Sequence, residues 1–337
     1  MSGCSQRSAW RCSSPRVNEL AKHFRLIATG VSGVPLRTPL DDDVMALLGD
    51  DRPVREFSEL IRPKFGPFGK HFICSVPHAF EEWCRLGAAV SYELVQKSLR
   101  LARPTKFYAC GNAEGVMTRG IGVAGRGRIL TLTASSTPEN EAEFHRTGVP
   151  AGSSFIAKPF FDISLEMLAD SPFADGFDVI FEDTCFQMHG HNRCEQIEFV
   201  ASLLRPDGIF IAMEKCYEHA APEEYHVREE RKAWFKSQYF TSEQISEKLE
   251  TIVYQMEANL VSFDELVEAT AAHFKNVVVT WNSGNFYTIA ASNDADAIIS
   301  LCRSMLPPLL PQEFQHINLP FISRGEFSSL CFGAPLR

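Results

Sequence analysis

Short apolar segments alternate with amphipathic segments from residue 105 onwards, and this alternation predicts a mostly parallel sheet made of strand–helix units. Five segments have the length and composition of strands: 107–110, 128–134, 154–157, 177–181 and 209–213. Two further strands, 276–281 and 285–291, flank Asn282-Ser283-Gly284, a sequence typical of a hairpin. We therefore predict an α/β fold with a seven-stranded sheet, helices on both faces and a terminal antiparallel hairpin.

The region before the sheet, 16–104, is predicted to form a helical cap. Its apolar periodicity predicts helices over 17–28, 41–48 and 78–101, the last of them ended by Pro104. Between 62 and 77, proline, glycine and phenylalanine alternate without a period of 2 or 3.6, which predicts a loop with aromatic anchors.

After the fifth strand, residues 217–260 break the strand–helix rhythm and predict a charged helical insertion, with a new helix start at Thr241. The next helix begins at Ser262, which forms a capping box with Glu265. Aromatic side chains lie among the charges of the insertion, so we expect it to cover the active site as a lid, together with the 62–77 loop. A homodimer interface and a solvated charged face are the alternatives that this pattern leaves open.

The two ends of the chain differ in character. Residues 1–15 are rich in serine and arginine and are predicted to be disordered. Residues 301–337 contain many prolines and phenylalanines. They are too apolar to remain in solvent, so we expect them to pack on the sheet domain.

The composition is that of a globular protein. Its 337 residues, 45% of them hydrophobic, can bury a large core. The net charge of −9 argues against a nucleic-acid partner, because affinity for phosphate backbones comes from clustered lysine and arginine. The ten cysteines form no CxxC pair, and no segment approaches ~18 uninterrupted apolar residues. We expect a cytoplasmic protein that binds a small molecule and no membrane.

The first strand ends in a turn that predicts a ligand site. After Cys110 the chain reads Gly111-Asn112-Ala113-Glu114-Gly115 and then enters a helix. Such a turn offers backbone N–H groups and a helix N-terminus to a ligand, and its small side chains let the ligand lie against the backbone. This geometry is typical of nucleotide binding.

The order of these features resembles a class I S-adenosylmethionine-dependent methyltransferase. The resemblance covers about 106–292, with 217–260 as an insertion, and it implies a Rossmann-like domain over 105–300. Its most specific piece is Leu203-Leu204-Arg205-Pro206-Asp207-Gly208 before a strand, where the family commonly has Leu-Leu-(Lys/Arg)-Pro-Gly-Gly. The resemblance implies S-adenosylmethionine (SAM) as cofactor, held at its methionine end by the turn. It also implies methylation of oxygen, nitrogen or carbon on a small apolar or aromatic acceptor.

Two positions depart from the family pattern. Ala109 stands where an acidic residue usually precedes the first glycine, and Ser135 stands where the second strand usually ends in a carboxylate that binds the ribose. A serine lacks the charge-assisted strength of that carboxylate. Glu114 could bind the cofactor instead, and a non-methylating member of the fold that binds a ligand or partner is the alternative. An NAD-dependent oxidoreductase is disfavoured, because the Gly-x-Gly-x-x-Gly pattern is absent.

In a parallel α/β sheet, ligands bind beyond the carboxyl ends of the strands, so the candidate site residues follow these ends. The residues expected to bind the cofactor are Gly111, Asn112, Ala113, Glu114, Gly115, Ser135, Phe160, Phe161 and Glu182, with the two phenylalanines placed to sandwich an adenine.

The expected catalytic residues follow the fourth and fifth strands. The family resemblance places the transferable methyl group and the acceptor beside the loop after the fourth strand. The expected catalytic residues are Asp183, His189, His191 and Glu214. A histidine could remove a proton from the acceptor near neutral pH. A divalent metal held by Asp183, His189, His191 and Glu195 is the second interpretation of this loop.

Overall fold

The computed structural model describes residues 20–41, 45–218, 220–327 and 330–333. The predicted disorder of residues 1–15 lies outside these residues, as do the first three residues of the helix predicted over 17–28. Among the described residues, none of the helices combines the length and the apolar character that crossing a bilayer requires.

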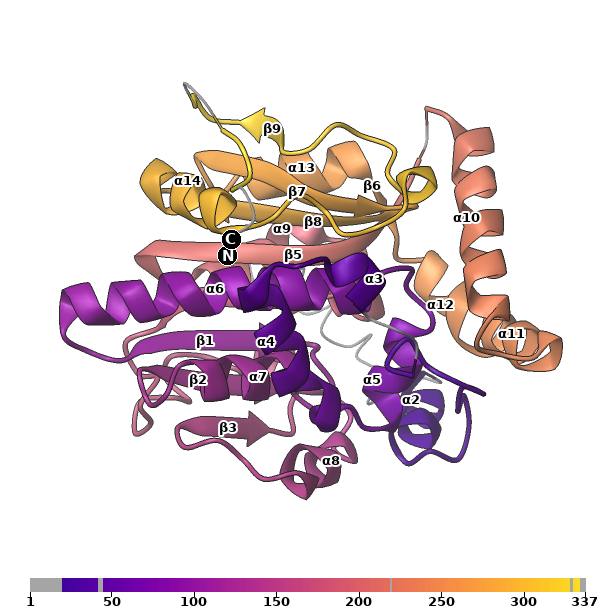
Figure 1. The fold of residues 1–337 in the computed structure, drawn as a ribbon, viewed down its shortest axis with the longest axis horizontal. Helices are drawn as coiled ribbons and strands as arrows, with labels where there is room; N and C mark the ends of the chain where they lie inside the picture. Colours follow the sequence, from indigo (N-terminus) through magenta and orange to yellow (C-terminus); the bar gives the residue numbers. More distant parts are fainter. Residues whose placement is uncertain (1–19, 42–44, 219, 328–329, 334–337) are drawn as a thin grey trace, which may run out of the picture.

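A nine-stranded sheet forms the centre of the molecule (Figure 1). Its strands run in the order β3-β2-β1-β4-β5-β8-β7-β9, and the short β6 pairs with β5. Strands β1 to β5 are mutually parallel, whereas β8 runs antiparallel between β5 and β7. The bounds are β1 Thr105–Cys110, β2 Ile129–Ala134, β3 Ser153–Ile156, β4 Phe177–Asp183, β5 Leu204–Tyr217, β6 Val261–Ser262, β7 Asn276–Ser283, β8 Phe286–Ser292 and β9 Phe321–Arg324.

The seven predicted strands are all present, and the α/β prediction is confirmed. The predicted count of seven was too low, because β6 and β9 are short edge strands that pair only through tertiary contacts. The family-like turn at 205–208 interrupts the pairing of β5: Leu204 pairs with Phe177, and the next pair is Ile209 with Val179. Residues 205–208 therefore bulge out of the strand rather than preceding it.

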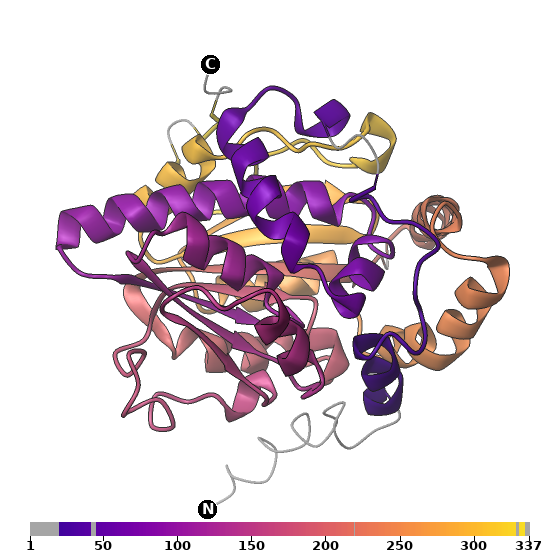
Figure 2. The same cartoon turned by 60° about the horizontal axis from the view of Figure 1, so that its bottom comes forward.

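Helices cover both faces of the sheet (Figures 1 and 2). Alternate residues of each strand enter different cores, because successive strand side chains point to opposite faces. Phe107 and Ala109 belong to one core, while Tyr108 and Cys110 belong to the other. The first core includes α4 Arg52–Ile61, α6 Ala79–Leu101, α7 Val116–Ala124 and α14 Ala295–Ser304, and the second includes α9 Arg193–Ala201 and α13 Phe263–Ala271.

The prediction of a loop over 62–77 was wrong, because residues 67–73 form helix α5 (Pro67–Ile73) after a 3₁₀ turn at Arg62–Lys64. Proline at the first helical position starts the helix. The backbone N–H groups of Gly66 and Gly69 both donate to Glu114 Oε1 at 2.7 Å. A Cβ on either glycine would lie 2.9 Å from that oxygen, so both positions require glycine. A carboxylate distant in sequence thus completes the start of this helix.

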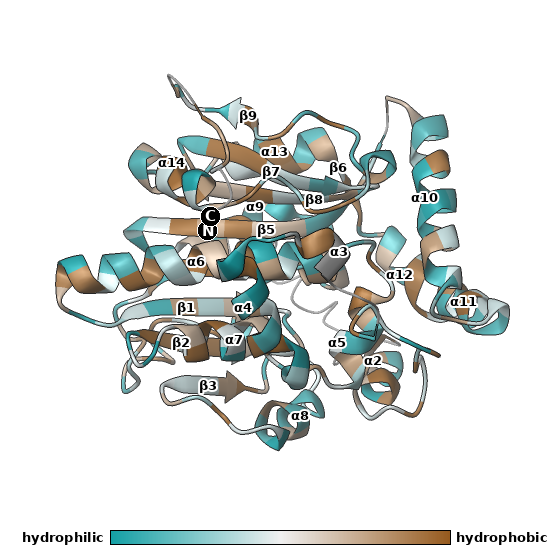
Figure 3. Ribbon diagram, in the orientation of Figure 1, coloured by the Kyte–Doolittle hydropathy of each residue, from teal (hydrophilic) through white to brown (hydrophobic). Residues whose placement is uncertain are grey.

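The insertion after β5 is helical, as predicted, and consists of α10 Pro222–Ser237, α11 Ser242–Lys248, a π-helical turn Leu249–Val253 and α12 Tyr254–Glu257. Thr241 and Ser262 both form capping boxes at helix starts. Helix α10 is mainly hydrophilic along its outer side (Figure 3). Against the insertion packs α2 (Leu20–Ala28), and the two share a small third core. We call this core, made of Leu20, Phe24, Ile27, Ile252, Phe68, Met188 and Met256, the lid core.

The remaining elements are α3 Met45–Leu48, α8 Asn140–Arg146 and the 3₁₀ turns Phe160–Asp162, Phe186–Met188 and Gln312–Phe314. The C-terminal segment runs back across the molecule, where β9 pairs with β7.

Removing the Glu114 carboxylate should detach the start of α5 from the turn that follows β1. We expect Glu114→Ala to lower the free energy of unfolding by about 2–4 kcal/mol, because two buried N–H groups lose their acceptor. Glu114→Gln, which keeps Oε1 as an acceptor, should lose less, and Glu59→Ala at an exposed position is the control. Urea denaturation measures all three; an equal effect of Glu114→Ala and Glu59→Ala would refute the role of this contact.

Candidate functional site

A pocket lies at the point where the strand order reverses between β1 and β4, beyond the carboxyl ends of the strands. We call it the switch-point pocket. It is lined by Phe24, Phe68, Gly111, Ala113, Ala134, Ser135, Ser136, Thr137, Asn140, Pro159, Phe160, Cys185, Met188 and His189. Of the predicted residues, Gly111, Ala113, Ser135, Phe160 and His189 therefore face one cavity.

The backbone of the turn after β1 lies close to the loop that follows β4. Gly111 has φ +86°, and a Cβ there would lie 2.5 Å from Cys185 Cβ, so only glycine fits. Its N–H donates to the Ala134 carbonyl at 3.2 Å. Asn112 lies behind the turn, where its amide donates to Asp183 Oδ2 at 2.7 Å and its oxygen accepts from the Met117 N–H. Asn112 thus braces the turn.

The wall formed by the end of β2 is polar but uncharged. Ser135 Oγ accepts from the Thr137 N–H at 3.2 Å and from Asn140 Nδ2 at 3.1 Å. Asn140 Oδ1 is buried and has no hydrogen-bond partner among the described residues. A buried acceptor without a donor is costly, so this oxygen is placed to receive a hydroxyl or amine of a ligand. Sequence reasoning missed Asn140; its only signal was its position at the start of the helix after β2.

Aromatic rings close the far wall. Phe160 and Phe161 meet edge to face, with centroids 5.5 Å apart at 74°, so no ring fits between them. Phe160 lines the pocket, while Phe161 packs against the His189 ring. His189 is buried, and burial together with Arg193 lowers its pKa to about 3, so the imidazole is neutral at physiological pH. Its Nδ1 has no partner among the described residues.

Three other predicted residues have structural contacts in the interior. Glu114 is fully buried and bonded to α5, away from the switch-point pocket, and the predicted contact with the cofactor finds no support in this arrangement. Glu182 accepts from the Cys185 and Phe186 N–H groups. Glu214, on β5, is paired with Arg193 at 3.2 Å instead of pointing to the pocket mouth. Burial raises the pKa of both Glu182 and Glu214.

The four proposed metal ligands do not gather. Asp183 and His189 are buried, whereas His191 is exposed and lines a separate surface groove with Arg193 and Cys194. In the part of the chain that the structure describes, no three His, Cys, Asp or Glu side chains form a group that could hold a metal ion.

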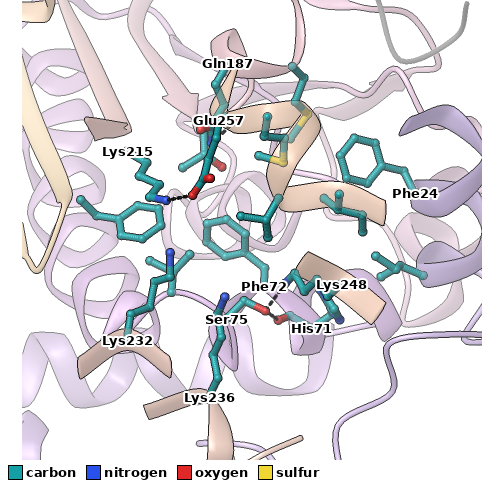
Figure 4. A pocket seen from close by; sticks show the side chains of 18 of the residues that line it. Phe24, His71, Phe72, Ser75, Gln187, Lys215, Lys232, Lys236, Lys248 and Glu257 are labelled. Carbon is teal, nitrogen blue, oxygen red and sulfur yellow. Dashed lines mark hydrogen bonds and ion pairs between the residues drawn. The ribbon is translucent and has the colours of Figure 1, made fainter. Parts of the chain in front are cut away.

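A second pocket adjoins the first and shares Phe24, Phe68 and Met188 with it. We call it the lysine-lined pocket, because Lys215, Lys232, Lys236 and Lys248 line it beneath the insertion (Figure 4). Its volume is about 100 Å³, against about 20 Å³ for the switch-point pocket. The other lining residues are Ile27, His71, Phe72, Ser75, Val76, Thr184, Gln187, Ile252, Val253, Met256, Glu257 and Phe286.

The lysines were not found from the sequence, because they are spread over β5, α10 and α11 and only the tertiary fold brings them together. Lys215 is paired with Glu229 at 3.1 Å and Glu257 at 3.0 Å. Lys232 also donates to Glu229. Two other polar atoms of this pocket, His71 Nε2 and Gln187 Oε1, are buried without a partner among the described residues.

The sequence matches no protein-family model and no curated protein. Solved structures with a similar arrangement include an O-methyltransferase from Bacillus cereus in complex with SAH, at 14% identity, 76% coverage of this chain, 97% coverage of that chain and a TM-score of 0.42. Another is a plantazolicin methyltransferase in complex with a monoazolic desmethylPZN analogue and SAH, at 13% identity, coverages of 82% and 98%, and a TM-score of 0.44. Both are methyltransferases, the family that the sequence resembles. At this level of similarity they carry no assignment of activity to this chain.

The buried Asp183 should leave a signature in the pH dependence of stability. Burial raises its pKa to about 7, from an ordinary value near 3.8, so the folded state holds a proton that the unfolded state releases. The contribution of the Asp183 carboxyl group to the free energy of unfolding is fully present below about pH 4 and is lost as the pH rises towards and through about 7. Asp183→Asn, whose oxygen can still accept from Asn112, should therefore be more stable than the wild type at about pH 8 by roughly 2–4 kcal/mol.

Urea denaturation of wild type and Asp183→Asn between about pH 4 and 8 checks this expectation. The two stability curves should diverge as the pH rises. Parallel curves would contradict a protonated Asp183 in the folded state.

Proposed function

We propose that this protein is a SAM-dependent methyltransferase acting on a small molecule with an apolar or aromatic body. The observation that carries the proposal is the switch-point pocket. It combines the glycine turn after β1, which the sequence resemblance assigns to SAM, with unpartnered polar atoms at the carboxyl ends of the strands. The antiparallel β8, inserted between β5 and β7, distinguishes the sheet from the 3-2-1-4-5-6 order of dinucleotide-binding oxidoreductases.

The residues of the switch-point pocket fit SAM in chemistry. Gly111 and Ala113 bring the backbone to the pocket wall for the methionine end, while Asn140 Oδ1, whose amide nitrogen is held by Ser135, offers a ribose hydroxyl an uncharged acceptor in place of the family carboxylate. The cavity of about 20 Å³ has room for about one water molecule, so the cofactor requires the covering side chains to withdraw. Phe24 and Phe68, whose ring centroids lie 5.7 Å apart, are these covering side chains.

The lid core gives this movement a physical basis. It is a small cluster separate from the two cores of the sheet, and it joins α2 and α5 to the π-helical turn and α12. Small clusters with few buried apolar contacts open at lower free energy than the main core of a domain. The lid would open to admit ligands and close to exclude water from the reaction.

The lysine-lined pocket would hold the acceptor. When bound, SAM supplies an electrophilic methyl group for in-line displacement. Met188 belongs to both pockets, so an acceptor atom near it would face the cofactor side. His71 Nδ1 lies 2.7 Å from the Gly33 carbonyl, which holds the proton on Nδ1 and leaves Nε2 as a lone-pair acceptor. His71 Nε2 is therefore an acceptor for a ligand N–H or O–H at the lysine end of the pocket, and the predicted His189, which lines the switch-point pocket with Met188, is our candidate to receive the acceptor proton.

Neutrality of His71 follows from its surroundings. Burial and the ammonium group of Lys248 lower its pKa well below the ordinary value. The imidazole is thus ready to accept a hydrogen bond at neutral pH without losing a proton first. Positioning by the apolar walls, more than base strength, would then promote transfer.

Binding of S-adenosylhomocysteine tests the cofactor assignment. We expect calorimetric titration of the purified protein to give a dissociation constant in the range of about 1 μM to 1 mM. Ser136→Trp, which fills the half-buried mouth of the switch-point pocket, should abolish binding without lowering thermal stability.

Ser202→Trp, at an exposed position at the end of α9, is the matched control and should bind as the wild type does. No heat and no thermal shift with the wild type at millimolar ligand would refute the proposed function. Equal binding by Ser136→Trp would remove the switch-point pocket as the site.

A further inference from the structure

The lysine-lined pocket holds more positive charge than its own carboxylates balance. Glu229 and Glu257 both pair with Lys215, and Glu229 also pairs with Lys232. Lys236 is 5% exposed and has no hydrogen bond or ion pair among the described residues. Lys248, which is half-buried, donates to the uncharged Ser75 Oγ at 2.5 Å. Two of the four ammonium groups therefore lack a counter-ion in the part of the chain that the structure describes.

An uncompensated buried ammonium group is costly, and burial of such groups without partners is rare. Burial, with the neighbouring Lys248, lowers the pKa of Lys236 to about 7. Burial, with Lys232, lowers the pKa of Lys248 to about 7 as well. A bound anion would relieve this repulsion and restore both ammonium groups to their charged form.

We propose that Lys236 and Lys248 bind the anionic group, a carboxylate or a phosphate ester, of an otherwise apolar acceptor molecule. This inference rests on the proposed function and names its substrate class. The walls between these polar side chains are mainly apolar, and the pocket volume of about 100 Å³ compares with ~150 Å³ for an engineered cavity that binds benzene, so the pocket suits a small ring or a short acyl chain.

The two ends of the pocket give the acceptor its orientation. Lys236 and Lys248 lie at one end and Gln187 at the other (Figure 4). The Gln187 end borders the switch-point pocket through Met188, and Gln187 Oε1 is a buried acceptor without a donor. An acceptor with an anion at one end and a hydroxyl or amine at the other would satisfy Gln187 and both lysines. The hydroxyl or amine would then face the methyl donor.

Binding of three probes to the full-length protein, in the presence of S-adenosylhomocysteine, tests this proposal. The probes are phenylacetate, phenyl phosphate and the neutral isostere phenylacetamide, titrated by calorimetry. We expect at least one anionic probe to bind about tenfold or more tightly than phenylacetamide, because it gains a buried charge pair. The tighter of the two anions names the group that the site recognises.

Lys236→Met and Lys248→Met should each reduce this preference about tenfold, whereas Lys236→Arg should retain it in part and Lys275→Met, at an exposed position, should retain it fully. Anion affinity should also fall as the pH rises from about 6 to 9, because Lys236 and Lys248 lose their protons. The charged and titratable groups that face Lys236 are Lys248, Lys215, Lys232, Glu229, Glu257 and His71. Those that face Lys248 are Lys232, Lys236, His71 and Cys74. Glu229, its pKa lowered to about 2, stays ionised throughout this range.

Equal affinity of the wild type for the anions and phenylacetamide would overturn the proposal, as would an unchanged preference in both methionine variants. These outcomes are separable from failure of the proposed function. Anion binding without any binding of S-adenosylhomocysteine would uphold the lysine site and refute the methyltransferase assignment. Binding of S-adenosylhomocysteine without anion preference would refute the lysine site and uphold the cofactor assignment.

Discussion

The buried carboxylate of Glu114 joins the two parts of the molecule that form the site. It lies on the turn that leaves β1, yet it accepts hydrogen bonds from the start of α5 in the N-terminal region. Arg119, one helical turn further on, donates to the Lys64 carbonyl and to carbonyls at the end of α8. These contacts hold the cap against the turn after β1 and the helix that follows it. Both pockets therefore arise between two parts of the chain that are far apart in sequence.

The two pockets have different electrostatic characters, which follow from what surrounds them. Glu182 and Asp183 on β4 and Glu214 on the neighbouring β5 are buried towards the carboxyl ends of these strands, and burial raises the pKa of each. Beneath the insertion, burial lowers the pKa of three of the four lysines, and carboxylates raise that of Lys215 against the effect of burial. Burial thus favours the neutral forms of these three carboxyl groups and three lysines, and their electrostatic interactions with a ligand are weakly screened. Closure of the lid core would strengthen them further.

Sequence reasoning identified the sheet because its strands are short apolar segments that alternate with amphipathic ones, and because its helix starts have local signals. The capping boxes at Thr241 and Ser262 and the hairpin around Gly284 depend on residues within a few positions of one another. Helix α5 was missed because its N–H acceptor is Glu114, which no local pattern reveals. The candidate site was only partly predicted for the same reason. Gly111, Ser135 and His189, which were predicted, line the switch-point pocket. Asn140 and the four lysines were not predicted, because only tertiary packing brings them to the two pockets.

The sequence by itself determined the order of strands and helices and the glycine turn after β1, because periodicity and backbone freedom act over short distances. It also determined that an uncharged polar residue, Ser135, and not a carboxylate, would follow β2. Only the tertiary structure decided which charged side chains meet in the interior and which are paired. Burial and charge pairing depend on residues brought together from distant segments, and they set the pKa of each group in the site.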